Sequence, residues 1–329
     1  MNVKQKLILI SLTVSVLITG LKFAAYLLTH SNAILTDALE SIINVLAAGF
    51  AFFSLQMAAQ PRDFDHPYGH GKIEFFSAGF EGALIILAGI FIIQKAVLSF
   101  FYPEPITDIS TGIILIGITV FVNGMLGWQL KKQGKKFRSA VLQADGEHLL
   151  IDVISSVFVV IGIFVILLTD LYWIDSVLSL VLSGIILWNG FKLVRKAAAK
   201  LMDEADPETL AEIVGVLNQK RLPNWIDIHN LRVQQYGADR HIDCHLTLPY
   251  YLTLRQVHDE SEAVQNLIAS ETPGKLEIFI HTDPCLPPDN CHSCQVADCP
   301  VRKADFSGNA VWTITKVVTD AKHFMQENE

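Results

Sequence analysis

Six long apolar segments dominate the first two thirds of the sequence and limit what the chain can fold into. Each is long enough to cross a hydrocarbon core of about 30 Å as a helix. They cover roughly residues 6–29, 33–56, 77–101, 111–130, 142–168 and 172–192. A hydrophobic content of 51% and a mean hydropathy of +0.39 are too high for an ordinary soluble enzyme of 329 residues. We therefore predict a membrane α-helical bundle of six transmembrane helices over residues 1–200.

The positive charges of the short loops alternate along this series. Lys and Arg residues occur before the first segment, between the second and third, between the fourth and fifth, and after the sixth, whereas the other loops carry none. Short cytoplasmic loops are enriched in Lys and Arg. Both chain termini are therefore predicted to be cytoplasmic, in a multi-pass protein of the cell (inner) membrane.

The charge outside the apolar segments and the positions of the cysteines limit which binding partners are expected. The formal net charge of −8 comes mostly from residues after Met202, and no basic patch typical of nucleic-acid binding is visible. The five cysteines avoid the outward loops, which fits thiols or metal ligands in a reducing compartment. The lipid bilayer is therefore an expected partner, and nucleic acid is not.

Four ionisable residues interrupt the fifth apolar segment, namely Asp145, Glu147, His148 and Asp152. An aspartate at the centre of a span costs about 2.5–3.5 kcal/mol on insertion scales, so these residues need compensation. His148 and Asp152 are four residues apart, and Asp145 is three residues before His148, which places all three on one face of a helix. An imidazole nitrogen and a carboxylate oxygen on that face can both reach one metal ion.

The second segment carries a matching pattern in Asp37, Glu40 and Asn44, with spacings of three and four residues. Two helices with matched polar faces can meet across one small site, where Glu40, Asn44, His148 and Asp152 could supply four ligands in a tetrahedron. The alternative is an interhelical hydrogen-bond network that only stabilises the bundle. Two matched faces that include a histidine favour the metal site.

The loop between the second and third segments contains Asp63, His66, His70 and Lys72 in the sequence Asp-Phe-Asp-His-Pro-Tyr-Gly-His-Gly-Lys. Spacings of three and four residues allow a helical turn or a glycine-assisted loop to bring Asp63, His66 and His70 onto one metal. A solvated polar loop is the alternative on composition alone.

These features together resemble the cation diffusion facilitator family, whose six-span members export divalent transition metals in exchange for protons. The resemblance rests on the two polar faces, on the His66-Pro-Tyr-Gly-His70-Gly-Lys72 loop and on the His281-Thr-Asp283-Pro pattern, and it runs from about residue 8 to about residue 284. It implies a secondary active transporter, not an enzyme, that works by proton antiport and alternating access as a homodimer. The direction of transport, efflux, comes from this resemblance.

The resemblance also implies roles for particular residues. Each protomer is expected to hold a transport site at Glu40, Asn44, His148 and Asp152 and a loop site at Asp63, His66 and His70. Asp37 and Asp145 are expected to support the ligands or to line the access path. Lys72 and Asp203 are expected to form a charge interlock where the third and sixth helices meet at the cytoplasmic surface.

Glu40 and Asn44 depart from the family pattern, because many members that handle zinc or iron have two aspartates, or a histidine and an aspartate, at these positions. The predicted site keeps two carboxylates and one imidazole, which suits Zn²⁺. Its carboxylate and carbonyl oxygens also suit Mn²⁺ or Fe²⁺. Zinc is therefore the first expectation, as substrate and as regulatory ligand.

The pattern of residues 201–284 predicts a cytoplasmic α+β domain of the ferredoxin-like or metallochaperone-like type. Asp206 is a good N-cap and Pro207 a good first residue for a helix to about Gln219. Strands are predicted near 225–236, 239–248 and 275–282, with a helix near 253–270, in the order α-β-β-α-β. The family resemblance implies a binuclear metal cluster across the dimer, formed by His229, His245, His258, His281 and Asp283.

Residues 285–329 do not follow the family pattern and contain Cys285, Cys291, Cys294 and Cys299. A single Cys-x-x-Cys unit with one cysteine on each side is a moderate zinc signal, so a bound Zn²⁺ is the first interpretation. An iron–sulfur centre and unligated or redox-active thiols stay open. Alternation over residues 310–325 predicts a strand followed by a short helix.

Two other classes of protein compete with a transporter. An intramembrane metal-dependent hydrolase would need an open metal position and a general base, as in His-Glu-x-x-His, and no such motif occurs in the sequence. A membrane-anchored metal sensor, whose cytoplasmic domain is the working part, would not need buried carboxylates in the second and fifth segments. The polar faces therefore favour a divalent transition-metal transporter.

Overall fold

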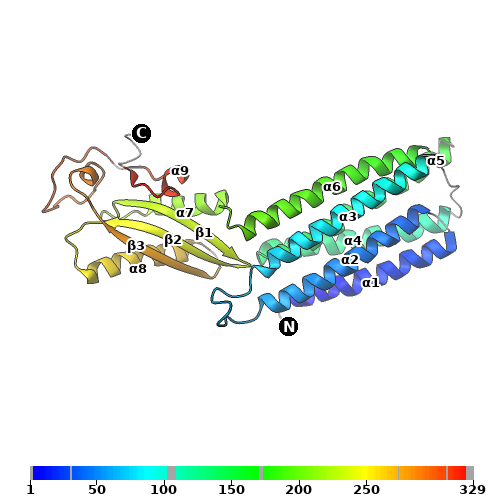
Figure 1. The fold of residues 1–329 in the computed structure, drawn as a ribbon, viewed down its shortest axis with the longest axis horizontal. Helices are drawn as coiled ribbons and strands as arrows, with labels where there is room; N and C mark the ends of the chain where they lie inside the picture. Colours follow the sequence, from blue (N-terminus) through cyan, green and yellow to red (C-terminus); the bar gives the residue numbers. More distant parts are fainter. Residues whose placement is uncertain are drawn as a thin grey trace. The chain divides into compact units, whose positions relative to one another are not determined.

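The computed structural model describes residues 3–29, 32–101, 109–169, 173–272, 274–308 and 310–323. Within some of the described helices the side chains of single residues lie outside this description, and Asp37 and Glu40 are among them. The chain divides into two compact units, Met1–Met202 and Asp203–Glu329. Figure 1 shows the first unit as a bundle of long helices and the second as a small sheet with helices.

Six long helices form the described part of the first unit, as predicted. They are α1 (Val3–Thr29), α2 (Asn32–Ala58), α3 (Ile73–Phe101), α4 (Ile109–Lys136), α5 (Ala140–Thr169) and α6 (Trp173–Leu201). A chain in lipid has to satisfy its backbone hydrogen bonds internally, which a helix does. Among the described residues, three stretches combine membrane-spanning length with high hydropathy, namely Val3–Ala24, Ile73–Leu98 and Ile114–Lys136. The apolar stretch found in α2 is shorter, Asn44–Ala58.

The helices pack so that α2 and α5 are neighbours. Helix α3 packs mainly against α6, α4 against α5 and α1 against α2. Further contacts of α1 with α4 and of α2 with α5 close these four helices into a group. Leu55 of α2 and Leu130, Leu142 and Leu149 of α4 and α5 form part of its buried core. The two polar faces predicted from the sequence are therefore on helices that touch.

Gly146 allows α4 and α5 to come close together beside the polar face of α5. A Cβ atom at this position would lie 2.5 Å from the backbone nitrogen of Lys131 and 2.9 Å from the backbone oxygen of Gly127. Neither backbone atom can move without displacing α4. Small residues let helix backbones approach in this way in membranes. Gly146 therefore helps to fix the position of His148, two residues further along α5.

Replacing Gly146 by alanine is expected to lower the free energy of unfolding of the bundle by about 1–3 kcal/mol, because the added methyl group overpacks the contact between α4 and α5. Thermal unfolding of the purified protein in detergent measures this loss. Gly117→Ala is the matched control, since Gly117 is on α4 and a Cβ there meets no described atom within 4 Å. Equal unfolding temperatures for the two variants would contradict the close contact.

The second unit confirms the predicted α-β-β-α-β order. Its elements are α7 (Pro207–Gln219), β1 (Asp227–Tyr236), β2 (Asp239–Leu248), α8 (Leu254–Glu271) and β3 (Leu276–Pro284). The strand order is β1-β2-β3, with β1 antiparallel and β3 parallel to β2. Asp206 caps α7 by accepting a hydrogen bond from the backbone N–H of Glu208. Thr253 and Gln256 form a capping box at the start of α8.

The two faces of the sheet differ in chemistry. Ile228, Cys244 and Leu246 belong to the buried core that the sheet forms with α7 and α8. Side chains alternate between the faces along a strand. His229, directly after Ile228, and His245, between Cys244 and Leu246, therefore lie on the opposite face. The histidines predicted to bind metal on β1 and β2 share the face that is turned away from the helices.

The residues after β3 pack against the sheet and helices of the same unit. They contain a 3₁₀ turn, η1 (Asp289–His292), and a short helix, α9 (Ile314–Val317). Trp312 is only 2% exposed and belongs to the same core as α7. Its backbone C=O accepts from the Asn218 amide over 2.7 Å and its N–H donates to Asn218 Oδ1 over 3.2 Å. The predicted strand after residue 310 is therefore wrong for the described residues, because this backbone pairs with a side chain of α7 instead of a strand.

Candidate metal sites

Asn44 of α2 meets His148 and Asp152 of α5 in the interior of the bundle. The Asn44 amide nitrogen donates to Asp152 Oδ2 over 2.6 Å, and the Asn44 Oδ1 atom contacts His148 Nε2. His148 Nε2 also lies 3.8 Å from Asp152 Oδ1. All three residues are at most 6% exposed. The two polar faces are thus joined at one buried point, which we call the buried triad.

The buried triad offers ligand atoms that suit a divalent transition metal. Imidazole nitrogen suits zinc and iron, and carboxylate and amide oxygens also suit manganese. In the hydrogen-bond pattern of the structure, Asn44 turns its NH₂ group to Asp152 and its oxygen to His148, so His148 Nε2 is the donor of that contact. A metal and a hydrogen therefore compete for Nε2. The same atoms can hold either a metal ion or a proton.

Two further residues of α2 and one of α5 were predicted at this site. Asp37 and Glu40 belong to α2, but their side chains lie outside what the structure describes, so their roles stay predictions. Asp145 is buried and accepts a hydrogen bond from Ser11 Oγ of α1 over 2.7 Å. This contact joins α5 to α1 one helical turn before His148.

The structure adds Glu81 of α3, which the polar faces did not indicate. Glu81 is 3% exposed, and its Oε1 atom has no hydrogen-bond partner among the described residues. Among the charged groups near Glu81, Asp145 and Asp152 act on it most strongly. After Glu74, Glu81 is the only acid in α3. An isolated acid inside an apolar run was the signal that could have found it.

The three residues predicted for the loop site lie together, and we call them the loop triad. Asp63 Oδ1 accepts from the backbone N–H of His66 over 2.6 Å, and Asp63 Oδ2 lies 3.4 Å from His70 Nε2. One ligand atom from each residue lies within 4.8 Å of the others. Gly69 has a φ of +89°, which turns the chain between the two histidines. The hydrogen bond from the His66 backbone lowers the pKa of Asp63, which favours its ionised, metal-binding form. Metal binding at this triad stays a prediction.

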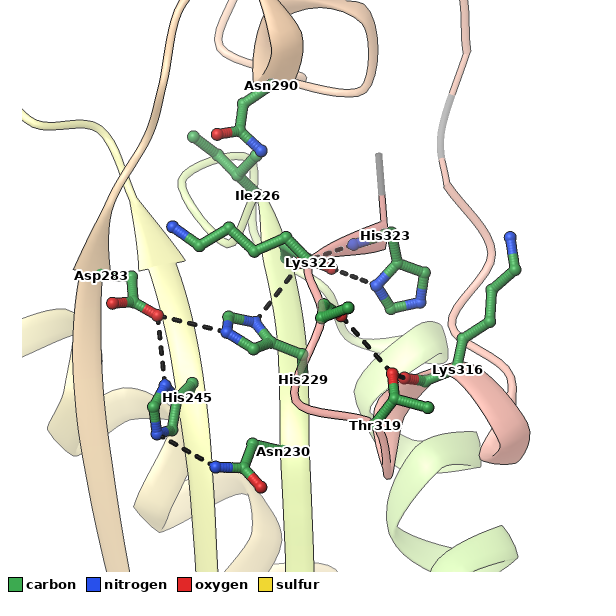
Figure 2. Close-up of polar contacts among 12 residues, drawn as sticks. Ile226, His229, Asn230, His245, Asp283, Asn290, Lys316, Thr319, Lys322 and His323 are labelled. Atoms are coloured by element: carbon green, nitrogen blue, oxygen red, sulfur yellow. Dashed lines mark hydrogen bonds and ion pairs between the residues drawn. The ribbon is translucent and has the colours of Figure 1, made fainter. Parts of the chain in front are cut away.

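His229 of β1, His245 of β2 and Asp283 of β3 form a further group on the face of the sheet turned away from α7 and α8, the sheet triad (Figure 2). Asp283 Oδ2 lies 3.3 Å from His229 Nε2 and 3.3 Å from His245 Nδ1. The His281 ring lies 4.6 Å from the His245 ring, and its Nε2 atom lies 3.7 Å from Asp283 Oδ1. His258 is exposed on α8, which packs on the other face. Within one chain the structure therefore brings together four of the five residues predicted for this domain.

Asp227 and His323 lie behind His229 and were not predicted. Asp227 Oδ2 lies 3.4 Å from His229 Nδ1 and accepts from the His323 backbone N–H over 3.2 Å, while Asp227 Oδ1 contacts the His323 ring. Burial would raise the pKa of Asp227, but its hydrogen bonds with His229 and His323 outweigh burial and lower that pKa. Asp227 therefore stays a carboxylate that orients His229, with Nε2 directed at Asp283. The spacing Asp-x-His on one strand face was a signal for Asp227, whereas nothing local indicated His323.

Asp227→Asn is expected to weaken Zn²⁺ binding to the sheet triad about 10–100-fold, because loss of the carboxylate behind a metal-binding histidine has an effect of this size. Calorimetric titration of the full-length protein measures the affinity. Asp239→Asn is the matched control, since Asp239 is an exposed acid at the start of β2 and pairs only loosely with Lys275 at 3.9 Å. Identical titration curves for both variants would show that Asp227 does not orient a ligand.

The four cysteines predicted for the tail are gathered in one place. All five cysteines of the chain carry free thiols. One small cavity next to Ile226 and Arg302 is lined by Cys285, Cys291, Cys294 and Cys299. Cys244, by contrast, belongs to the core of the sheet.

A helical bundle with a buried set of metal ligands, joined to a small domain with its own histidine and aspartate group, defines a membrane protein that handles metal cations. Residues 8–202 match the cation efflux transmembrane domain, and residues 205–285 match the cytoplasmic domain of cation efflux proteins. The chain belongs to the cation diffusion facilitator family of cation efflux transporters.

Individual relatives support this assignment over most of their length. The chain is 35% identical over 265 residues to the uncharacterized transporter sll1263 of Synechocystis sp., a match that covers 80% of this chain and 85% of the relative. It is 26% identical to the manganese efflux system protein MneP of Bacillus subtilis, over 86% of this chain and 97% of the relative. It is also 26% identical to the cation-efflux pump FieF of Serratia proteamaculans, over 80% of this chain and 87% of the relative. The family and the fold class predicted from the sequence are confirmed.

Proposed function

We propose that this protein exports a divalent transition metal from the cytoplasm in exchange for protons, with Zn²⁺ as the preferred substrate. The buried triad is the observation that carries the proposal. A buried histidine and aspartate from one helix and an asparagine from a neighbouring helix meet at hydrogen-bonding distance inside a transmembrane domain. Ionisable groups at such depth are expensive, and in membranes they mark ion pathways.

Proton exchange follows from the chemistry of the triad. On the cytoplasmic side, a metal that binds His148 Nε2 and Asp152 releases the protons that the imidazole and the carboxylate took up on the outer side. On the outer side, protonation of the imidazole and of the carboxylate removes the ligand lone pairs and frees the metal. Imidazole is suited to this exchange because it titrates near neutral pH. Alternating access of one buried site to the two sides then couples the two ion flows.

The choice of metal depends on how many oxygen ligands take part. His148 with Asp152 and Glu40 would give an imidazole and two carboxylates, which suits Zn²⁺. If the Asn44 carbonyl also binds, the oxygen-rich set suits Mn²⁺ or Fe²⁺ as well. The name of the relative MneP refers to manganese efflux, so manganese is the first competitor to test.

The cytoplasmic domain is proposed to regulate transport within a homodimer. Cytoplasmic metal bound at the sheet triad, together with His281 and His258, would favour one conformation by binding it more tightly. The alternation of positive loops supports a cytoplasmic position for both termini, and we propose the cell (inner) membrane as the location. Lys72 and Asp203 belong to different units of the structure, and their interlock remains part of this proposal.

Transport by the purified protein in liposomes with an acidic interior tests the proposal. Zn²⁺ added outside is expected to enter while the pH gradient lasts and to stop entering when a protonophore abolishes the gradient. Parallel assays with Mn²⁺ and Fe²⁺ rank the substrates. If none of the three metals responds to the gradient although the sheet triad binds metal, the protein is a membrane-anchored metal sensor instead.

A further inference from the structure

The small cavity lined by the four tail cysteines, the cysteine cavity, contains none of the residues proposed for transport. The match to the cytoplasmic domain of the family ends at residue 285, so three of the four cysteines follow it. Cys285, Cys291 and Cys294 are buried, and Cys299 is partly exposed. We propose that these four cysteines bind one structural Zn²⁺ ion as a tetrathiolate.

Backbone hydrogen bonds hold two of these cysteines in position. The Cys285 N–H donates to the Leu248 carbonyl over 2.8 Å, which fixes Cys285 at the end of the sheet. Between Cys285 and Cys291, the buried Asn290 closes a turn, because its Oδ1 accepts from the Leu286 N–H over 2.7 Å and its own N–H donates to the Leu286 carbonyl over 3.0 Å. The turn brings Cys291 back towards Cys285.

An arginine and a backbone donor lie beside the cysteine sulfurs, where they can stabilise a zinc tetrathiolate of net charge −2. The Arg302 guanidinium donates to the carbonyls of Cys291, Cys294 and Val296 over 3.1, 3.0 and 2.6 Å. The Lys303 N–H points at Cys291 Sγ over 3.5 Å. Burial raises the pKa of the Cys294 thiol, and Arg302 acts in the opposite direction. Donors and cations directed at sulfur stabilise thiolate ligands.

Zinc fits this site better than redox chemistry does. Reactive thiols are partly exposed, whereas three of these four are buried. Soft thiolates select zinc or iron–sulfur clusters among biological metals. Among the described residues, only the loop triad and the sheet triad have three ligand atoms within 4.8 Å of one another. Zinc–sulfur bonds of about 2.3 Å would therefore draw the four sulfurs inward, and the segment between Cys285 and Cys299 can follow because only the short turn η1 is regular there.

The site would fasten the extension to the domain. Residues beyond the cysteines continue to Trp312 in the core of the domain and to His323, which contacts Asp227 behind the sheet triad. A structural zinc at this point would limit the freedom of the chain that leads to both contacts. Its role is to stabilise the fold, and it is independent of whether the bundle transports metal.

Cobalt substitution of the full-length protein tests this proposal. Co²⁺ bound by thiolates gives an intense sulfur-to-metal charge-transfer band in the near ultraviolet. The buried triad, the loop triad and the sheet triad contain no cysteine and cannot give this band. The band is expected in the parent protein and equally in Asp152→Ala, which disables the proposed transport site. Zn²⁺ is expected to displace cobalt and to abolish the band.

The double variant Cys291→Ser/Cys294→Ser is expected to lose the band and to contain one zinc ion fewer per chain. Cys244→Ala is the matched control and should keep both, since Cys244 is the single cysteine outside the cavity. A parent protein without the band overturns the proposal whether or not any variant folds. Iron with acid-labile sulfide after anaerobic purification would overturn it in favour of a cluster, and a Cys291–Cys294 disulfide under reducing purification would overturn it in favour of redox thiols.

Discussion

Asp152→Ala and His148→Ala are each expected to lower proton-driven metal uptake by more than about 100-fold. Loss of a residue that only hydrogen-bonds to a metal ligand costs about 10–100-fold in metal affinity or activity. Each of these substitutions removes a ligand itself, which is a larger change. Either change also leaves the remaining buried polar groups unpaired. The initial rate of Zn²⁺ uptake into liposomes at a fixed pH gradient measures the effect.

Glu147→Gln is the matched control for this pair. Glu147 is an acid on the same helix, next to His148, but its side chain is 46% exposed and lies 3.4 Å from Lys131. Such exposed ion pairs contribute about 0–1 kcal/mol, so uptake by Glu147→Gln is expected to stay at the parent rate. Parent-level uptake by Asp152→Ala, with the protein folded in detergent, would rule out the buried triad as the transport site.

Trp312→Ala is expected to lower the free energy of unfolding of the cytoplasmic domain by about 3–5 kcal/mol, because it leaves a cavity in the core. The indole packs with residues of α7, and the Arg221 guanidinium lies over it at 4.1 Å from the ring centroid. Hydrogen exchange of the amides in α7 and β1, measured on the full-length protein in detergent, reports the loss. Exchange there should accelerate, while the amides of α3 and α6 keep their protection.

Val311→Ala is the control for this prediction, since Val311 is adjacent in sequence but 68% exposed. Little change is expected, because exposed substitutions usually alter stability by less than about 0.5 kcal/mol. If both variants exchange at the parent rate, the extension does not contribute to the core of the domain.

The elements that depend on local pattern were predictable from the sequence. Apolar length gave the six helices, and the alternation around Cys244, with Asp206 and Pro207 at a helix start, gave the α-β-β-α-β domain. The spacings of His148 with Asp152 and of His66 with His70 placed each pair on one face or in one turn. In each case the residues that act together are only a few positions apart, so the geometry of a helix, strand or tight turn determines where they lie.

The remaining features depend on contacts between distant segments. Glu81 is seven residues from Glu74, the other acid of α3, and its relation to Asp152 exists only because α3 packs against α5. Asp227 and His323 are 96 positions apart, and neither flanking sequence indicates the other. The strand predicted after residue 310 failed for the same reason, since the backbone at Trp312 bonds to the side chain of Asn218 and not to a neighbouring strand.

The extension after residue 285 also determines where the folded domain ends. The match to the family's cytoplasmic domain ends at residue 285, yet Trp312 completes the hydrophobic core and His323 completes the environment of His229. A domain that stops at residue 285 would lack both side chains, although every residue of the matched region is kept. The extension therefore belongs to the folding unit of the domain, although the family model does not include it.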